Sequence, residues 1–179
     1  MPRPDVRTVV LYEDEPHGKF VRQLTRKLGL RPERLEPCGG SGLLLDRFVV
    51  ELKAMRHKMK YQRNLGLMVV VDADNASITP RIQELTGRLL TSETGGQRGD
   101  TERIAYVVPA LEIENWYIHL CVPEARPVDE GKDYKREPVW RELEKDLASA
   151  ARQAVSAWGR VEQEEPASLT AARRELERL

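Results

Sequence analysis

The chain has 179 residues, 40% of them hydrophobic, and its 29 lysines and arginines balance its 29 aspartates and glutamates. This length is enough for one domain with a buried core and a small helical extension. No apolar run approaches the roughly 18 residues of a membrane-spanning helix, and the first residues lack the apolar segment of a signal peptide. We therefore expect a cytoplasmic protein with no membrane partner, which attracts nucleic acid only through local basic patches.

The cysteines and histidines show no ligand spacing. Cys38 and Cys121 are far apart and form no C-x-x-C pair, and His17, His57 and His119 are equally dispersed. This pattern argues against a disulfide framework and against a zinc site.

The amino-terminal segment predicts a strand followed by a helix. Residues 6–12 form a β-branched run that ends at Glu13, where two further acidic residues and a proline follow. Apolar side chains then recur at helical spacing over residues 17–28, and Gly29 stands where a C-cap glycine is typical.

The next segments repeat this alternation. Residues 34–38 predict a short strand, which ends at Gly39-Gly40, and residues 43–63 predict a long helix with basic residues on its outer part. An uninterrupted apolar run over residues 67–71 then predicts a strand buried on both faces, as in a parallel sheet with helices on each side.

Two aspartates, Asp72 and Asp74, directly follow this buried strand. Residues two apart on an extended chain point to the same side, and ligand crevices form at the carboxyl ends of parallel strands. The strand rise places the two Cβ atoms roughly 6 to 7 Å apart, which suits oxygen coordination of a divalent cation. A loop of solvated acids, or an N-cap for a helix that begins near Ile78, is the simpler alternative.

The following elements complete a βαβαβαβα order. We expect a helix over residues 78–90, a glycine-rich polar loop over 91–101, a strand over 103–108 and a helix over 111–120. This order predicts an α/β fold with a parallel sheet of about four strands flanked by helices.

The chain changes character after residue 121. A segment rich in prolines and charges predicts an irregular connection that extends to Pro138. Helical periodicity then predicts one helix from Trp140 to Trp158 and a terminal amphipathic helix over residues 167–179, which we expect to pack on the sheet domain or on a partner. The predicted division is an α/β domain over residues 1–121 and an extension over residues 122–179.

Three acidic residues converge in this scheme if their strands are neighbours. Glu13 ends the first strand, and Asp72 and Asp74 end the third. Carboxylates held together raise one another's pKa unless a cation neutralises them, so the arrangement indicates a bound metal or a proton donor.

The pattern resembles the Toprim family, in which a strand is followed by a glutamate and a helix, and a later strand ends in Asp-x-Asp. Tyr12-Glu13-Asp14 stands at the first motif, with Asp14 where glycine is usual, and Val71-Asp72-Ala73-Asp74 stands at the second. Pro109 to Trp116 is similar to the Pro-x-x-x-Ile-Glu-x-Trp element of small prokaryotic Toprim-like proteins. Those proteins are catalogued as domain of unknown function 4276 and are relatives of OLD-type nucleases.

This resemblance spans roughly residues 7 to 120 and implies a Toprim-like nuclease that uses Mg²⁺ or Mn²⁺ to hydrolyse DNA or RNA. It implies that Glu13, Asp72 and Asp74 are metal ligands and catalytic acids, with Glu114 as a further catalytic residue. A first-turn acid that interacts with the helix dipole is the alternative for Glu114. The resemblance also implies an ATPase partner in antiphage defence. Alternatively, the terminal helices are expected to join two copies of this chain into a homo-oligomer.

Basic residues that follow the second strand and the glycine-rich loop are candidates for phosphate contact, although a basic helix is more often a solvated face. They are Lys53, Arg56, Lys58, Lys60, Arg63, Arg98 and Arg103.

Two alternatives remain open. Val9 to Pro16 also resembles the first strand of receiver domains, which gather acids around magnesium. In that family a phosphoacceptor aspartate ends the third strand, whereas Asp72-Ala73-Asp74-Asn75 stands roughly twenty residues later than this resemblance implies, and no lysine follows Pro109. The other alternative is a Toprim-like binding module without catalysis.

Overall fold

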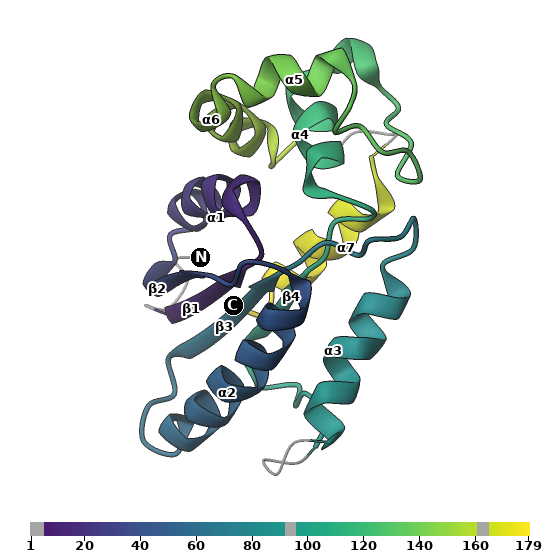
Figure 1. Ribbon diagram of the computed structural model, residues 1–179. Coiled ribbons are helices and arrows are strands. Elements are labelled where there is room, and N and C mark those ends of the chain that lie inside the picture. Colours follow the sequence, from purple (N-terminus) through teal and green to yellow (C-terminus); the bar gives the residue numbers. More distant parts are fainter. Residues whose placement is uncertain (1–5, 92–95, 161–164) are drawn as a thin grey trace.

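Strands and helices alternate along the chain in a computed structural model that describes residues 6–91, 96–160 and 165–179 (Figure 1). The strands are β1 (Arg7–Tyr12), β2 (Arg31–Pro37), β3 (Leu65–Val70) and β4 (Ile104–Val107). The helices are α1 (Glu15–Lys27), α2 (Ser41–Met59), α3 (Thr79–Thr91), α4 (Ile113–Cys121), the short 3-10 helix η1 (Pro123–Ala125), α5 (Pro138–Glu144), α6 (Leu147–Ala157) and α7 (Ala167–Leu176).

The four strands form one parallel sheet in the order β2-β1-β3-β4. This confirms the α/β class and the four-stranded parallel sheet predicted from the sequence. β1 and β3 are direct neighbours, and their last residues, Tyr12 and Val70, are paired in register. The residues that follow these two strands therefore begin side by side at the carboxyl edge of the sheet.

Both faces of the sheet are covered, as the continuous apolar run of β3 predicts. Leu67 and Val69 belong to a hydrophobic cluster with side chains of α2 and α3. Met68 and Val70 belong to a second cluster on the other face, with side chains of α1, α4, α6 and α7 (Figure 1). Alternate strand residues point to opposite faces, so both sets are buried.

Helix α1 begins two residues earlier than its apolar spacing predicts. The side chain of Asp14 is the N-cap and accepts a hydrogen bond from the backbone N–H of His17, at 3.4 Å. Pro16 fits the first turn, where its missing N–H has no helical partner to lose. Gly18 then passes over the last residue of β1, since a Cβ at this position would lie 2.6 Å from the ring of Tyr12.

The carboxyl-terminal part differs from its prediction in one element. The single helix expected between Trp140 and Trp158 is two helices, α5 and α6, because the side chain of Asp146 accepts from the N–H of Ser149 at 3.0 Å and starts a new helix. Residues 92–95 of the predicted glycine-rich loop, and residues 161–164 before α7, lie outside the described residues.

The terminal helix docks on the sheet itself. α7 packs along β4, and Leu169, Leu176 and Leu179 are buried there. One hydrophobic cluster contains side chains from both sides of residue 121, including Trp116 and Trp158. Among the described helices, none has the length and apolar character needed to cross a bilayer.

Candidate functional site

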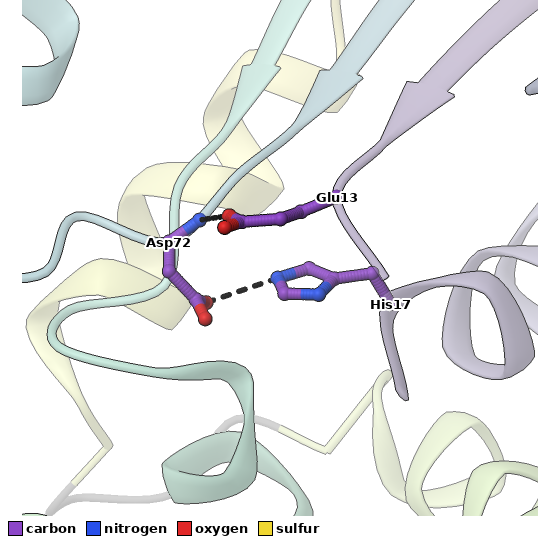
Figure 2. Close-up of side chains that lie close together, drawn as sticks. All are labelled: Glu13, His17 and Asp72. Atoms are coloured by element: carbon purple, nitrogen blue, oxygen red, sulfur yellow. Dashed lines mark hydrogen bonds and ion pairs between the residues drawn. The ribbon is translucent and has the colours of Figure 1, made fainter. Parts of the chain in front are cut away.

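Three side chains meet at the carboxyl edge of the sheet, between its two central strands (Figure 2). Glu13 follows β1, Asp72 follows β3, and His17 lies in the first turn of α1. Each offers one ligand atom, and these atoms all lie within 4.8 Å of one another. The sequence predicted Glu13 and Asp72 at this place and did not predict His17.

The backbone of the two strands sets this arrangement. Beyond the paired ends of β1 and β3, the N–H of Asp72 donates to Oε2 of Glu13 at 3.3 Å (Figure 2). The backbone carbonyl of Asp72 accepts from Nε of the buried Arg81, at 2.9 Å. The backbone of Asp72 is thus held from β1 on one side and from α3 on the other.

His17 lies between two aspartates and is fully buried. Its Nε2 is 3.0 Å from Oδ1 of Asp72, and its Nδ1 is 2.6 Å from Oδ1 of Asp14. Burial alone would lower the pKa of the imidazole, but the neighbouring carboxylates outweigh it and raise the pKa of His17 to about 10. His17 is therefore a buried imidazolium that donates to both aspartates.

The two acids around the turn respond differently to this charge. Burial, together with the charge of Asp72, raises the pKa of Glu13 above its ordinary value. Burial also opposes ionisation of Asp14, but the hydrogen bond and charge of His17 hold the pKa of Asp14 below its ordinary value. Asp14, at the position where the resembling family has glycine, is thus both the cap of α1 and a partner of His17.

Glu114 lies close to this cluster, in the first turn of α4. Its side chain is 4% exposed, and its Oε2 has no hydrogen-bond partner among the described residues. Burial raises the pKa of Glu114 to about 7, with a contribution from the charge of Asp72. The position agrees with the sequence prediction, and the group can carry a proton near neutral pH.

Lys135 brings a positive charge to the same edge from the connection after α4. Its Nζ lies 2.9 Å from Oε1 of Glu112 and 3.9 Å from Oε1 of Glu114. These carboxylates and Asp72 outweigh partial burial and raise the pKa of Lys135 above its ordinary value. Asn115 fixes the connection, because its side-chain amide donates to the backbone carbonyl of Lys132 at 3.3 Å.

Asp74 does not join the cluster of Glu13, His17 and Asp72. Its backbone is in the left-handed region, with φ 53°, which turns the chain away from the extended geometry that the prediction assumed. Its Oδ2 accepts from Arg81 at 2.6 Å, and its side chain is 61% exposed. Arg81 thus anchors both the backbone of Asp72 and the side chain of Asp74.

The basic residues proposed for phosphate contact are not gathered at this edge. α2 begins near the carboxyl ends of the strands and runs away from them, so Lys58 lines a small cavity with Arg7 and Leu65, where β1 and β3 begin. Lys60 and Arg63 lie beyond the end of α2, on the way to β3. Lys53 lies in the same half of α2 as Lys58.

The arginines of the set have structural partners. Arg56 donates to both carboxylate oxygens of Glu102, at 2.6 and 2.8 Å. Arg98 pairs with Glu175 and lies over the ring of Tyr106, and Arg103 donates to the backbone carbonyl of Leu179. These contacts join α2 and α7 to the segment that leads into β4.

Sequence reasoning missed His17, Arg81 and Lys135. His17 carried one usable signal, since it stands four residues after an acid that ends a strand, in the first turn of the next helix. Lys135 carried none, because its contact with Glu112 and Glu114 depends on the path of an irregular segment.

The donor set suits a divalent cation. Carboxylate oxygens are the ligands that Mg²⁺ and Mn²⁺ prefer. Both ring nitrogens of His17 already lie against carboxylates, so the oxygens of Glu13 and Asp72 are the atoms that fit a cation with the imidazolium in place.

Comparisons with known proteins add no assignment: no family model, no curated protein and no solved structure matches this chain.

Proposed function

We propose that this protein is a metal-dependent phosphodiesterase that hydrolyses DNA or RNA with Mg²⁺ or Mn²⁺. The observation that carries the proposal is the meeting of Glu13, His17 and Asp72 at the carboxyl ends of two adjacent parallel strands (Figure 2). This edge is where open α/β sheets bind their ligands. The Toprim resemblance supplies the reaction class, and the carboxylates of Glu13 and Asp72 are groups that could hold the metal ion this reaction needs.

Each residue has a role that follows from its contacts. Glu13 and Asp72 would hold a divalent cation, which would supply positive charge to the phosphate oxygens. His17 donates to Oδ1 of Asp72, at 3.0 Å, and so fixes the orientation of that carboxylate.

Glu114 supplies a proton. Its pKa of about 7 leaves it partly protonated at neutral pH, so it can give that proton to the leaving oxygen. Asp74, which the resemblance places among the metal ligands, acts in this proposal through Arg81 by holding the loop after β3.

Cleavage assays on single- and double-stranded DNA and RNA, with Mg²⁺ or Mn²⁺, test the proposal. Asp72→Asn and Glu13→Gln keep side-chain size and remove the charge, so we expect each to lose at least about a hundredfold in rate. Glu124→Gln is the matched control, because Glu124 is exposed in η1 and remote from the cluster. Equal rates in all four proteins would refute the assigned site.

Metal binding has a readout that needs no substrate. A cation that binds only the folded protein raises its melting temperature, by an amount that grows with concentration. We expect millimolar Mn²⁺ to raise the melting temperature of the wild type and of Glu124→Gln, and to leave that of Asp72→Asn unchanged. A wild type that melts at the same temperature with and without metal would contradict the site.

The remaining alternatives predict different results. The ATPase partner and antiphage role implied by the resemblance belong to the proposal, and cleavage by the isolated protein would show that the partner is not needed for the chemistry. A binding module would bind nucleic acid without cleaving it. A receiver-like phosphoacceptor needs an accessible aspartate, whereas the side chain of Asp72 is 6% exposed and hydrogen-bonded to His17.

A further inference from the structure

A cavity of about 270 Å³ opens directly beside Glu13, on the side of the sheet edge away from Asp72. Tyr12 and Gly18 lie on its wall where α1 crosses the end of β1, and Gly39 lies on its wall beyond β2. Glu13 therefore has His17 and Asp72 on one side and this cavity on the other.

The charges in the cavity are arranged along α1. Lys19 and Arg22 line it together with Gly18, one turn apart on the same face of the helix. Lys19 has one ion pair, with the exposed Glu15 at 3.5 Å, and the guanidinium of the exposed Arg22 has no ion pair with any described residue. Glu13, Asp14 and Glu15 line the cavity where the chain enters α1, and Lys19 and Arg22 line it one to two turns further along the helix.

Opposite α1, the cavity is bordered by Gly39, and the space around Gly39 and Gly40 is open. Gly39 has φ +77° and Gly40 φ +139°, and a Cβ on either would meet no atom within 4 Å. Helix α2 starts here without a side-chain cap and without an acidic residue in its first turn. The N-terminal end of this helix, which follows Gly39, carries a partial positive charge.

We infer that this cavity is a substrate subsite, in which Lys19 and Arg22 bind the phosphate that neighbours the scissile phosphate on a single nucleic-acid strand. The inference rests on the proposed function and extends it to the path of the substrate. A phosphodiester chain carries its charges one nucleotide apart, so a strand whose scissile phosphate lies at Glu13 and Asp72 places its next phosphate along α1.

The size of the cavity favours one strand over a duplex. Its volume is just below the roughly 300 to 1,000 Å³ of small-molecule sites, which is room for about one nucleotide unit. Tyr12, the aromatic residue on its wall, is buried beneath Gly18, so no exposed ring is offered for base stacking there. Recognition is therefore through the phosphate and is independent of base sequence.

The test measures binding separately from cleavage. The probe is a short fluorescein-labelled single-stranded oligonucleotide, as DNA and as RNA of the same sequence, titrated in Ca²⁺ and followed by anisotropy. The variants are Lys19→Gln, Arg22→Gln and the double variant, and the control is Arg26→Gln. Arg26 lies one turn further along α1, is exposed and does not line the cavity.

We expect the double variant to bind the oligonucleotide about tenfold more weakly, with Arg26→Gln close to wild type. The slope of log K against log salt should fall by about 0.7 for each phosphate that the variant no longer neutralises. In the cleavage assay, KM should rise more than kcat falls, because both side chains lie outside the cluster of Glu13, His17 and Asp72. Melting curves of all variants should coincide with that of the wild type, since neither side chain is buried.

The outcomes separate the subsite from the function. If the wild type cleaves and the double variant keeps its affinity and salt slope, the subsite is refuted and the proposed function stands. If the wild type binds the oligonucleotide through Lys19 and Arg22 but cleaves nothing with any metal, the subsite stands and the nuclease is refuted. If Arg26→Gln weakens binding as much as the double variant, the charge of the helix acts as a whole and the cavity is not the site.

Discussion

A protonated histidine links two aspartates at the candidate site. The imidazolium of His17 lies between Oδ1 of Asp14 and Oδ1 of Asp72, at 2.6 and 3.0 Å, and no part of it is exposed. The side-chain carboxylates of Asp72 and Glu13 repel each other, although the backbone N–H of Asp72 donates to Glu13, and the charge of His17 offsets this repulsion. The histidine therefore contributes to stability as well as to the geometry of the site.

The free energy of unfolding, measured in EDTA, should depend on pH because of the charge on His17. The pKa of His17 is raised from 6.5 to about 10 in the folded protein, so its contribution is complete below pH 6.5 and is lost as the pH rises toward 10. Urea unfolding in EDTA should show the free energy of unfolding falling across this window, by up to about 1.4 kcal/mol per pH unit. In His17→Gln this part of the fall should disappear, and a pH-independent difference between the two proteins would contradict the assignment.

Lys135 should tune the protonation of Glu114. Its charge opposes the effect of burial on that carboxyl, whose pKa is about 7, so Lys135→Met should move the pKa of Glu114 above 7. The measurement is an NMR pH titration of the side-chain carboxyl carbon-13 signals, with EDTA present to remove metal ions. Glu114→Gln identifies the signal of Glu114. Lys132→Met is the control, because Lys132 pairs with Glu137 instead. An unshifted Glu114 in Lys135→Met would show that Lys135 does not act on it.

Half of the site could be predicted from the sequence, for a physical reason. Glu13 and Asp72 each end a strand, and parallel neighbours bring such residues together whatever else the chain does. Asp74 could not be placed this way, because its left-handed backbone depends on contacts of the folded loop, among them the ion pair with Arg81. His17 and Lys135 reach the edge through tertiary packing that leaves no periodic signal.

At the scale of elements, the position of α1 against β1 decides where His17 points. Gly18 makes this approach possible, because any larger residue would press on the buried ring of Tyr12. Alanine is normally favoured over glycine inside a helix by about 1 kcal/mol. The close contact at this position works against that gain.

Gly18→Ala should therefore destabilise the protein in spite of its better helix propensity. Overpacking costs about 1 to 3 kcal/mol, which exceeds the propensity gain. Gly87→Ala in α3 is a matched control, since a Cβ at that position meets no atom within 4 Å, and it should stabilise by up to about 1 kcal/mol. Urea unfolding of the two variants measures both effects, and a stabilised Gly18→Ala would mean that α1 does not press on Tyr12.

Elements were predictable where one pattern dominated. β3 is buried on both faces and its sequence is an unbroken apolar run, so its position and its place in a parallel sheet could be predicted, whereas its neighbours could not. Between Trp140 and Trp158 the helix is interrupted, but the apolar periodicity continues. The cap of α6 at Asp146 leaves the spacing of the buried residues unchanged. Periodicity alone cannot show such a break, whereas an aspartate three residues before a serine N–H can.

At the scale of the whole molecule, α7 closes an exposed edge of the sheet. β4 is an edge strand in the order β2-β1-β3-β4, and such a strand presents unpaired N–H groups to other chains. The N–H of Tyr106 donates instead to Oε2 of Glu175 in α7, at 3.0 Å, and Arg98 donates to the same carboxylate. The apolar stripe that the sequence predicts to pack on the sheet domain or on a partner thus packs on the sheet domain.

Glu175→Ala should weaken this closure. The variant loses hydrogen bonds to a charged group, worth about 1.5 to 3 kcal/mol each, and leaves the N–H of Tyr106 and the guanidinium of Arg98 without this acceptor. For a chain of this length, a loss of about 2 kcal/mol lowers the melting temperature by roughly 4 to 8 °C. Light scattering should also detect association beyond that of the wild type, through the uncovered edge of β4.

Glu177→Ala provides the comparison, because Glu177 is an exposed acid two residues further along the same chain end. It should melt and scatter like the wild type. If Glu175→Ala also melts like the wild type and shows no added association, α7 holds β4 through its buried leucines alone, and the carboxylate has no part in protecting the edge. If it melts lower without association, the apolar contacts of α7 suffice to cover the strand even when its N–H groups are unpaired.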